Sequence, residues 1–124
     1  MAQTVLIVDD NNHLRDILGT ILRFYGYEIL EAATGAQAIE KAFSAKPNLI
    51  LLDFDLPDIA GLDTAIAIKR NPITADIPII GCSASTEMEL RKEALRAGMV
   101  EFLEKPIQAA VIAAKIQKFI SSER

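Results

Sequence analysis

The chain has 124 residues, of which 51% are hydrophobic and 24% charged, and its formal net charge at pH 7 is −4. This length and composition are typical of a globular protein, and we expect residues 1–124 to form one domain. The acidic balance argues against direct binding to nucleic acid, and no apolar stretch reaches the ~20 residues that a membrane-spanning helix needs, so membrane insertion is excluded.

The first part of the chain predicts a strand followed by a helix. Residues 5–8 form a continuous apolar run that is typical of a buried strand, and no basic segment precedes it as in a signal peptide. Apolar residues then recur at helical spacing until Gly26, a residue type that commonly ends helices. The residues of this helical pattern are Leu14, Ile17, Leu18, Ile21, Leu22 and Tyr25.

The middle of the chain repeats the same order. Residues 27–30 are a weaker strand candidate, and Thr34 with Gln37 forms a capping box that predicts the start of a second helix. The apolar residues expected on this helix are Ala38, Ile39, Ala42 and Phe43. A strand at residues 49–52 and a third helix over about residues 60–70 follow.

The next apolar run, residues 77–80, predicts a fourth strand and leads into the lone cysteine, Cys82. A single buried thiol excludes an internal disulfide and fits a reducing cytoplasm. Thr86 with Glu89 predicts the start of a fourth helix, which is expected to end at Gly98.

A weaker strand at residues 100–103 precedes a fifth helix that is expected to begin after Pro106. The residues expected to be buried on that helix are Val111, Ile112, Ile116 and Phe119. Five strand–helix pairs with short connections predict a doubly wound (βα)₅ α/β sandwich around a five-stranded parallel sheet. In such sheets ligands bind at the carboxyl ends of the strands.

Polar side chains follow four of the predicted strands at this edge: Asp9 and Asp10, Asp53, Ser83, and Lys105. Three neighbouring carboxylates repel one another unless a cation joins them, and oxygen ligands of this kind suit Mg²⁺. An amine and a hydroxyl complete a pocket for a phosphoryl group, and a carboxylate can be the nucleophile that receives it. The residue types therefore predict phosphoryl transfer to a carboxylate.

Each of these residues alone also has an ordinary structural interpretation. The pair Asp9 and Asp10 is typical of a helix N-terminus, and Asp53 can cap the loop after it. Ser83 can be a strand-end residue, and Lys105 can be a solvated surface lysine. Their joint placement at four strand ends favours the functional interpretation.

Over essentially its whole length the chain resembles the receiver domains of two-component response regulators, in particular the single-domain chemotaxis regulators. The resemblance rests on four segments in order: VLIVDD at residues 5–10, DFDLP at 53–57 with Gly61, IIGCSA at 79–84, and FLEKP at 102–106. It implies a flavodoxin-like form of the (βα)₅ sandwich, a cytoplasmic location, and a signalling switch that is not an enzyme acting on a separate substrate.

The resemblance assigns a role to each acidic residue. Asp53 corresponds to the phosphoacceptor, and Asp10 to a direct ligand of Mg²⁺ or Mn²⁺. Asp9 is expected to act mainly through a bound water, and the backbone carbonyl of Asp55 to complete the protein ligands.

The same resemblance places Lys105 and Ser83 on the phosphoryl oxygens and Phe102 at the position of a switch aromatic, expected to turn inward on phosphorylation. The bond between Lys105 and Pro106 is expected to be cis. Two residues depart from the usual pattern: Ser83 stands where Thr is more common, and Met99 where a small residue is common.

Asp55 and Ser85 each lie two residues beyond a pocket residue. We expect both side chains at the open mouth of the pocket, where a hydrolytic water enters. Asp55 is expected to hold that water, so both residues are candidates for setting the phosphoryl lifetime.

The implied partners are a sensor histidine kinase or a phosphotransfer protein, and an output protein on the face of the fourth helix, fifth strand and fifth helix. The fifth helix carries small residues, which provide either a flat docking face or simply good helix propensity. These residues are Ala109, Ala110, Ala113 and Ala114, together with Gln117.

Two other functions remain alternatives. Asp53-Phe54-Asp55 imitates the Asp-x-Asp motif of haloacid-dehalogenase-type phosphohydrolases, but it follows the third predicted strand instead of the first, and Pro57 departs from that motif. A phosphorylation-independent interaction module is expected to have lost part of the acidic pocket, whereas all five positions are filled here.

Overall fold

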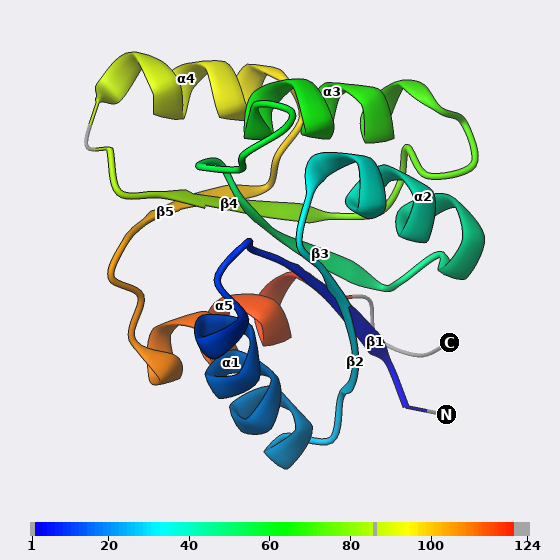
Figure 1. The fold of residues 1–124 in the computed structure, drawn as a ribbon, viewed down its shortest axis with the longest axis vertical. Coiled ribbons are helices and arrows are strands. Elements are labelled where there is room, and N and C mark those ends of the chain that lie inside the picture. Colours follow the sequence, from blue (N-terminus) through cyan, green and yellow to red (C-terminus); the bar gives the residue numbers. More distant parts are fainter. Residues whose placement is uncertain (1, 86, 121–124) are drawn as a thin grey trace.

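The computed structural model describes residues 2–85 and 87–120, and these form a parallel sheet between two layers of helices (Figure 1). The strands are β1 (Thr4–Val8), β2 (Glu28–Ala32), β3 (Leu49–Asp53), β4 (Ile79–Ser83) and β5 (Glu101–Glu104). The helices are α1 (Asn12–Phe24), α2 (Gly35–Ala45), α3 (Gly61–Arg70), α4 (Met88–Arg96) and α5 (Ala109–Phe119). The predicted (βα)₅ sandwich is confirmed.

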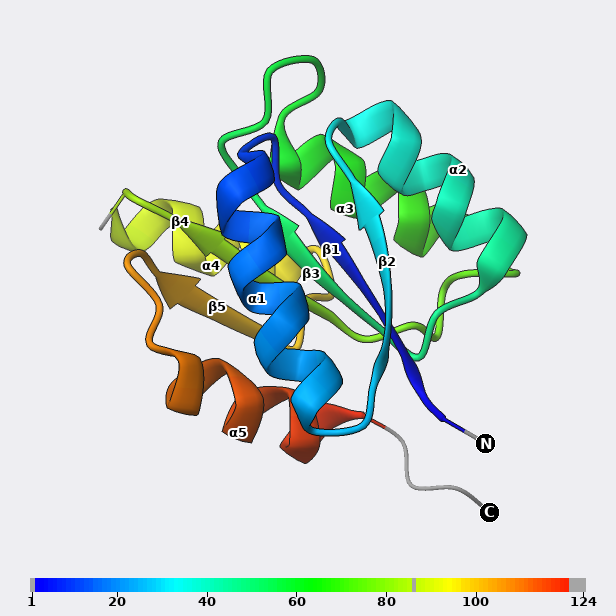
Figure 2. The ribbon, with the colours of Figure 1, turned by 60° about the horizontal axis from the view of Figure 1, so that its bottom comes forward.

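The strand order is β2-β1-β3-β4-β5, and every neighbouring pair is parallel. Helices α1 and α5 cover one face of the sheet, and α2, α3 and α4 cover the other (Figures 1 and 2). The order reverses between β1 and β3, so the carboxyl ends of these two strands flank the crevice where such folds bind ligands.

The core consists of two apolar clusters, one on each side of the sheet. Strand β3 contributes to both, because Leu49 and Leu51 face the α1–α5 layer while Ile50 and Leu52 face the other helices. All five residues of β3 are buried, which explains why its sequence is a continuous apolar run ending in one acid, Asp53.

Several helix ends follow the predicted signals. The Thr34 side chain accepts a hydrogen bond from the backbone of Gln37, whose own side chain accepts one from the backbone of Ala33. Gly26 and Gly98 have φ values of 95° and 104° and follow α1 and α4. Helix α4 begins at Met88, and Thr86, the expected cap, lies outside the described residues.

The apolar pattern overestimated the buried width of several helices. The prediction that Val111 lies in the core is wrong, because this residue is 42% exposed. Phe119, also expected in the core, is only partly buried. Ile17, Tyr25 and Phe43 are also exposed. Each helix packs on the sheet along one side only, so apolar residues at the edge of the helical stripe remain in solvent.

The two weaker strand candidates, β2 and β5, each begin one residue later than expected, and α5 begins at Ala109, three residues after Pro106. Among the helices described, none combines the length and apolar character needed to span a bilayer.

Candidate functional site

The three predicted carboxylates meet at the carboxyl edge of β1 and β3. One oxygen from each of Asp9, Asp10 and Asp53 lies within 4.8 Å of the others. Asp53 and Asp9 are only 2% and 4% exposed, whereas Asp10 is exposed. Hard oxygen donors at this spacing fit a divalent cation, which would neutralise their mutual repulsion.

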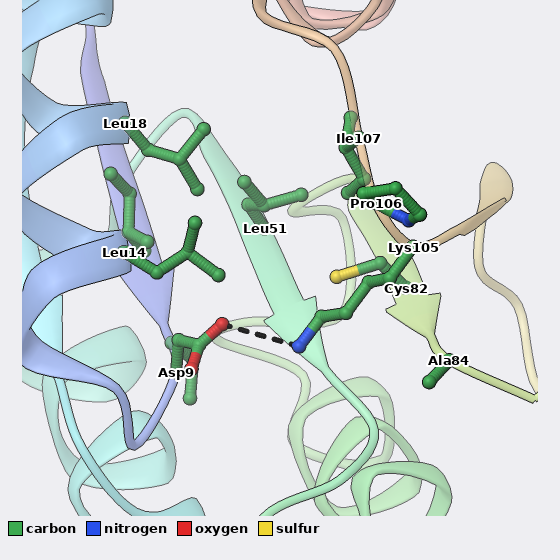
Figure 3. A pocket seen from close by; sticks show the side chains of 11 residues that line it. Asp9, Leu14, Leu18, Leu51, Cys82, Ala84, Lys105, Pro106 and Ile107 are labelled. Carbon is green, nitrogen blue, oxygen red and sulfur yellow. Dashed lines mark hydrogen bonds and ion pairs between the residues drawn. The ribbon is translucent and has the colours of Figure 1, made fainter.

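Lys105 follows β5 and reaches across the sheet edge to two of these acids. Its Nζ lies 3.0 Å from Asp53 Oδ1 and 3.4 Å from Asp9 Oδ2. Figure 3 shows the pair with Asp9. Its backbone N–H donates to Ser83 O, and the following bond to Pro106 is cis, as expected. The sequence therefore placed this amine correctly against the acidic cluster.

The surroundings shift the pKa of both partners of this ion pair. Burial raises the pKa of Asp53 above its ordinary value, against the opposing effects of the Asp55 N–H, 3.0 Å from Asp53 Oδ1, and of Lys105. Burial disfavours the charge on Lys105, but hydrogen bonding and attraction from Asp53, with the charge of Asp9, outweigh it and raise the Lys105 pKa. A buried carboxylate next to a like charge is a poorly solvated oxygen nucleophile.

The Ser83 side chain is buried, but its hydroxyl is directed at Asp55. It donates to Asp55 Oδ1 at 3.2 Å, and the backbone N–H of Ala84 donates to Asp55 Oδ2 at 3.2 Å. The N–H of Ser85 donates in turn to Ser83 Oγ. The sequence suggested an open position for the Asp55 carboxylate and did not indicate that it bridges the ends of β3 and β4.

Phe102 already occupies a buried position in this structure. It is 3% exposed, and its ring packs edge-to-face on Phe54 with centroids 4.9 Å apart. A Cβ added at Gly81 would lie 2.9 Å from both Phe102 Cδ1 and Met99 Sδ. Met99, the unusual residue noted above, therefore helps to fill the space around this ring, and no inward turn is required to bury it.

The loop after β3 is attached to α2 by a residue that sequence reasoning missed. Asp58 accepts hydrogen bonds from the backbone N–H groups of Gly35 at 2.8 Å and Ala36 at 3.1 Å. These N–H groups, led by that of Gly35, lower the pKa of the Asp58 carboxyl. These hydrogen bonds join residues that are 22 and 23 positions apart in the sequence. They depend on how two loops pack together, which local sequence patterns do not reveal.

An apolar pocket of about 350 Å³ opens beside the Asp9–Lys105 pair, between α1 and the segment after β5 (Figure 3). Its apolar lining includes Leu14, Leu18, Leu51, Cys82, Pro106 and Ile107. Cys82 is a free, buried thiol, and burial raises its pKa to about 12, so it is protonated and unreactive at neutral pH.

Residues 5–117 match the family model of the response regulator receiver domain. The chemotaxis protein CheY of Bacillus subtilis is 36% identical and aligns with 98% of this chain and 100% of its own length. The phosphate regulon transcriptional regulatory protein PhoB of Pseudomonas aeruginosa is also 36% identical, over 94% of this chain, but the chain spans only 51% of that relative.

Solved structures give the same result. The chemotaxis protein CheY4 of Vibrio cholerae has a TM-score of 0.91 and 27% identity, covering 97% of this chain and 100% of that one. The receiver domain of the sensor histidine kinase PA1611 from Pseudomonas aeruginosa, solved with a magnesium ion coordinated in its active site cleft, has a TM-score of 0.88 and 30% identity. It covers 98% of this chain and 100% of that structure.

Proposed function

Because this chain belongs to the response regulator receiver domain family of two-component signalling, we propose that Asp53 is its phosphoacceptor. The observation that carries this assignment is the buried Asp53 carboxylate, which lies within 4.8 Å of two further acids and 3.0 Å from the Lys105 amine. Residues 1–124 then form one receiver domain, which is a phosphoacceptor module without catalysis on a separate substrate.

The acidic cluster fits Mg²⁺, or Mn²⁺, better than a softer metal because every side chain in it offers oxygen. Asp10 and Asp53 would hold the cation directly, Asp9 through water, and Asp55 through its backbone carbonyl. When bound, such a cation offsets the charge of the acids and of the arriving phosphoryl group.

In the transfer itself, a carboxylate oxygen of Asp53 attacks phosphorus, and the bond from phosphorus to the donor's leaving group breaks. Lys105 pairs with the phosphoryl oxygens and offsets their negative charge. Ser83 gives up its hydrogen bond to Asp55 and donates to the phosphoryl group, and this change is passed to Phe102 on the neighbouring strand.

A sensor histidine kinase or a phosphotransfer protein would supply the phosphoryl group, in the cytoplasm, where the lone Cys82 stays reduced. The altered contacts of Ser83 and Phe102 lie on β4 and β5. We assign α4, β5 and α5 as the face that an output protein reads. The small-residue surface of α5 is a separate candidate docking face: Ala113 is buried, and the exposed Ala110 and Ala114 line a hollow together with Tyr25 and Tyr27, which follow α1.

The test is phosphorylation by acetyl phosphate, followed by intact-mass spectrometry. Wild type should gain one phosphoryl group in Mg²⁺ and none in excess chelator, Asp53→Asn should gain none, and Asp58→Asn, in the same loop, should behave as wild type. Incorporation in Asp53→Asn would refute the assignment. Rapid turnover of phosphate esters would favour the phosphohydrolase alternative. A wild-type protein that gains no phosphoryl group in Mg²⁺ would favour the phosphorylation-independent module.

A further inference from the structure

We propose that Arg15 is a positioning residue for the cation site: it fixes the peptide between Asp9 and Asp10 so that the Asp10 carboxylate is held ready for the metal. This inference rests on the proposed function, since it concerns the divalent cation at the acidic cluster. It assigns to Arg15 an action through the backbone, without contact to the cation or the phosphoryl group.

The Arg15 guanidinium reaches back from α1 to the loop that carries both acids. Its side chain is only 12% exposed, and its Nη1 donates to the carbonyl oxygen of Asp9. Its Nε donates to Glu31 Oε1 at 2.9 Å, and its Nη2 donates to Asn12 Oδ1. The rigid, planar fork of an arginine thus joins β2, the start of α1 and the acidic loop.

Glu31, which we call the anchor of Arg15, is itself held in place by its neighbours. It lies in β2 opposite Ile7 of β1, and its backbone carbonyl accepts a hydrogen bond from Lys41 Nζ of α2. Arg23 also approaches the Glu31 carboxylate, at 4.0 Å, but it has no contact with Asp9. Two arginines therefore share one anchor, and only Arg15 connects that anchor to the acidic loop.

Asp9 and Asp10 differ in how much they depend on this connection. The Asp9 carboxylate has its own partners, since it accepts from the backbone N–H of Asn11 at 2.9 Å and from Lys105. Within the described part of the chain, no hydrogen bond or ion pair holds the side chain of Asp10. The Asp9 carbonyl belongs to the peptide bond that leads into Asp10, so the hydrogen bond from Arg15 sets the direction in which Asp10 leaves the backbone.

Electrostatics and positioning predict opposite effects of removing Arg15, and this makes the proposal testable. A positive charge near a cation site weakens cation binding, so loss of the charge alone would tighten it. Loss of a group that orients a ligand weakens binding, by about 10–100-fold for the outer partners of metal ligands. We expect the loss of positioning to have the larger effect, since Glu31 already offsets much of the Arg15 charge.

The experiment measures Mg²⁺ affinity by calorimetric titration. The NMR shift of the Asp10 backbone amide and the unfolding of the protein in urea are measured separately, in chelator. Arg15→Ala should bind Mg²⁺ about tenfold more weakly, at the low end for such outer partners, and should shift the Asp10 amide. Arg15→Lys, which keeps the charge but loses the fork, should stay weak. Arg23→Ala, the matched control, loses an equal charge on the same anchor and should bind as wild type.

Arg15→Lys is also the second test should Arg15→Ala not fold, because it keeps the positive charge, so only the loss of positioning predicts weaker Mg²⁺ binding. Unchanged or tighter Mg²⁺ binding in the folded Arg15 variants would overturn the positioning role, whatever happens to their stability in urea. Failure of the wild-type protein to bind a divalent cation would instead overturn the proposed function, so the two failures are distinguishable.

Discussion

Replacing Asp55 with alanine should lengthen the life of the phosphorylated state. In the present structure the Asp55 carboxylate accepts hydrogen bonds from the Ser83 hydroxyl and the Ala84 N–H. When Ser83 turns to a phosphoryl group on Asp53, the carboxylate loses one of these donors. It then has a free oxygen lone pair at the exposed mouth of the site, where it can accept a hydrogen bond from the attacking water.

The size of the effect follows from one hydrogen bond. A bond of this kind that is made in the transition state for hydrolysis contributes about 1 kcal/mol, which is roughly fivefold in rate. Asp55→Ala should therefore hydrolyse its phosphoaspartate about fivefold more slowly. Mg²⁺ affinity should change little, because the proposed ligand is the backbone carbonyl of Asp55, which the substitution retains.

The assay is phosphate release from the phosphorylated protein at fixed, saturating Mg²⁺. Asp55→Asn, which keeps one acceptor oxygen, should lie between wild type and Asp55→Ala. Ser85→Ala should have a smaller effect, since the Ser85 hydroxyl oxygen already accepts the backbone N–H of Glu87. An unchanged or faster rate in Asp55→Ala would show that this carboxylate does not hold the water.

Three further outcomes are expected. Gly81→Ala should destabilise the fold by about 1–3 kcal/mol in urea and displace the Phe102 ring in NMR spectra, because its Cβ would lie 2.9 Å from that ring; an unmoved ring would contradict the packing argument. Since burial raises the Asp53 pKa, the folded state loses stability as pH rises through the titration of this carboxyl. Asp53→Asn in chelator should therefore melt at a higher temperature than wild type at pH 7, with the difference shrinking below about pH 4; a lower melting temperature at pH 7 would refute this. The Asp58 pKa is lowered, so its stabilising effect is present above the unfolded value and is lost as pH falls through the folded one. Asp58→Ala should thus lower the urea midpoint at pH 7 and match wild type near about pH 2, and equal midpoints at pH 7 would contradict the proposed cap.

The element order and the acidic cluster could be predicted because both follow from local patterns. Apolar runs mark the strands, and the residues that follow parallel strands lie at one edge of the sheet. Asp9, Asp53 and Lys105 could therefore be expected at that edge without knowing the strand order, and they meet there. Phe102 and Ser83 were placed on neighbouring strands in the same way, but their rotamers and partners were not. Those depend on the packing of residues that come together only in the folded chain, such as Gly81 and Met99.

The contacts that hold the acidic residues in place could not be read from the sequence. Arg15 meets Glu31 only because β2 lies beside β1 in the sheet, and the apolar pattern fits several strand orders equally well. The reach of Asp58 to the start of α2 likewise depends on how two loops pack. An exposed charged residue in a loop gives no local signal of the backbone group that it will bind.

The two sides of the acidic site are held in different ways, and this difference gives the switch its direction. On the β1 side, the Asp9 backbone is fixed by Ala32 and Arg15, neither of which a phosphoryl group would displace. On the β4 side, Ser83 is held by hydrogen bonds to Asp55 that a phosphoryl oxygen can replace one for one. Such an exchange leaves the two arrangements of Ser83 close in free energy. The ~1–3 kcal/mol that is typical of coupling between sites is therefore enough to shift the equilibrium between them. A phosphoryl group on Asp53 should therefore move the β4–β5 side, where Phe102 lies, and leave the α1 side in place.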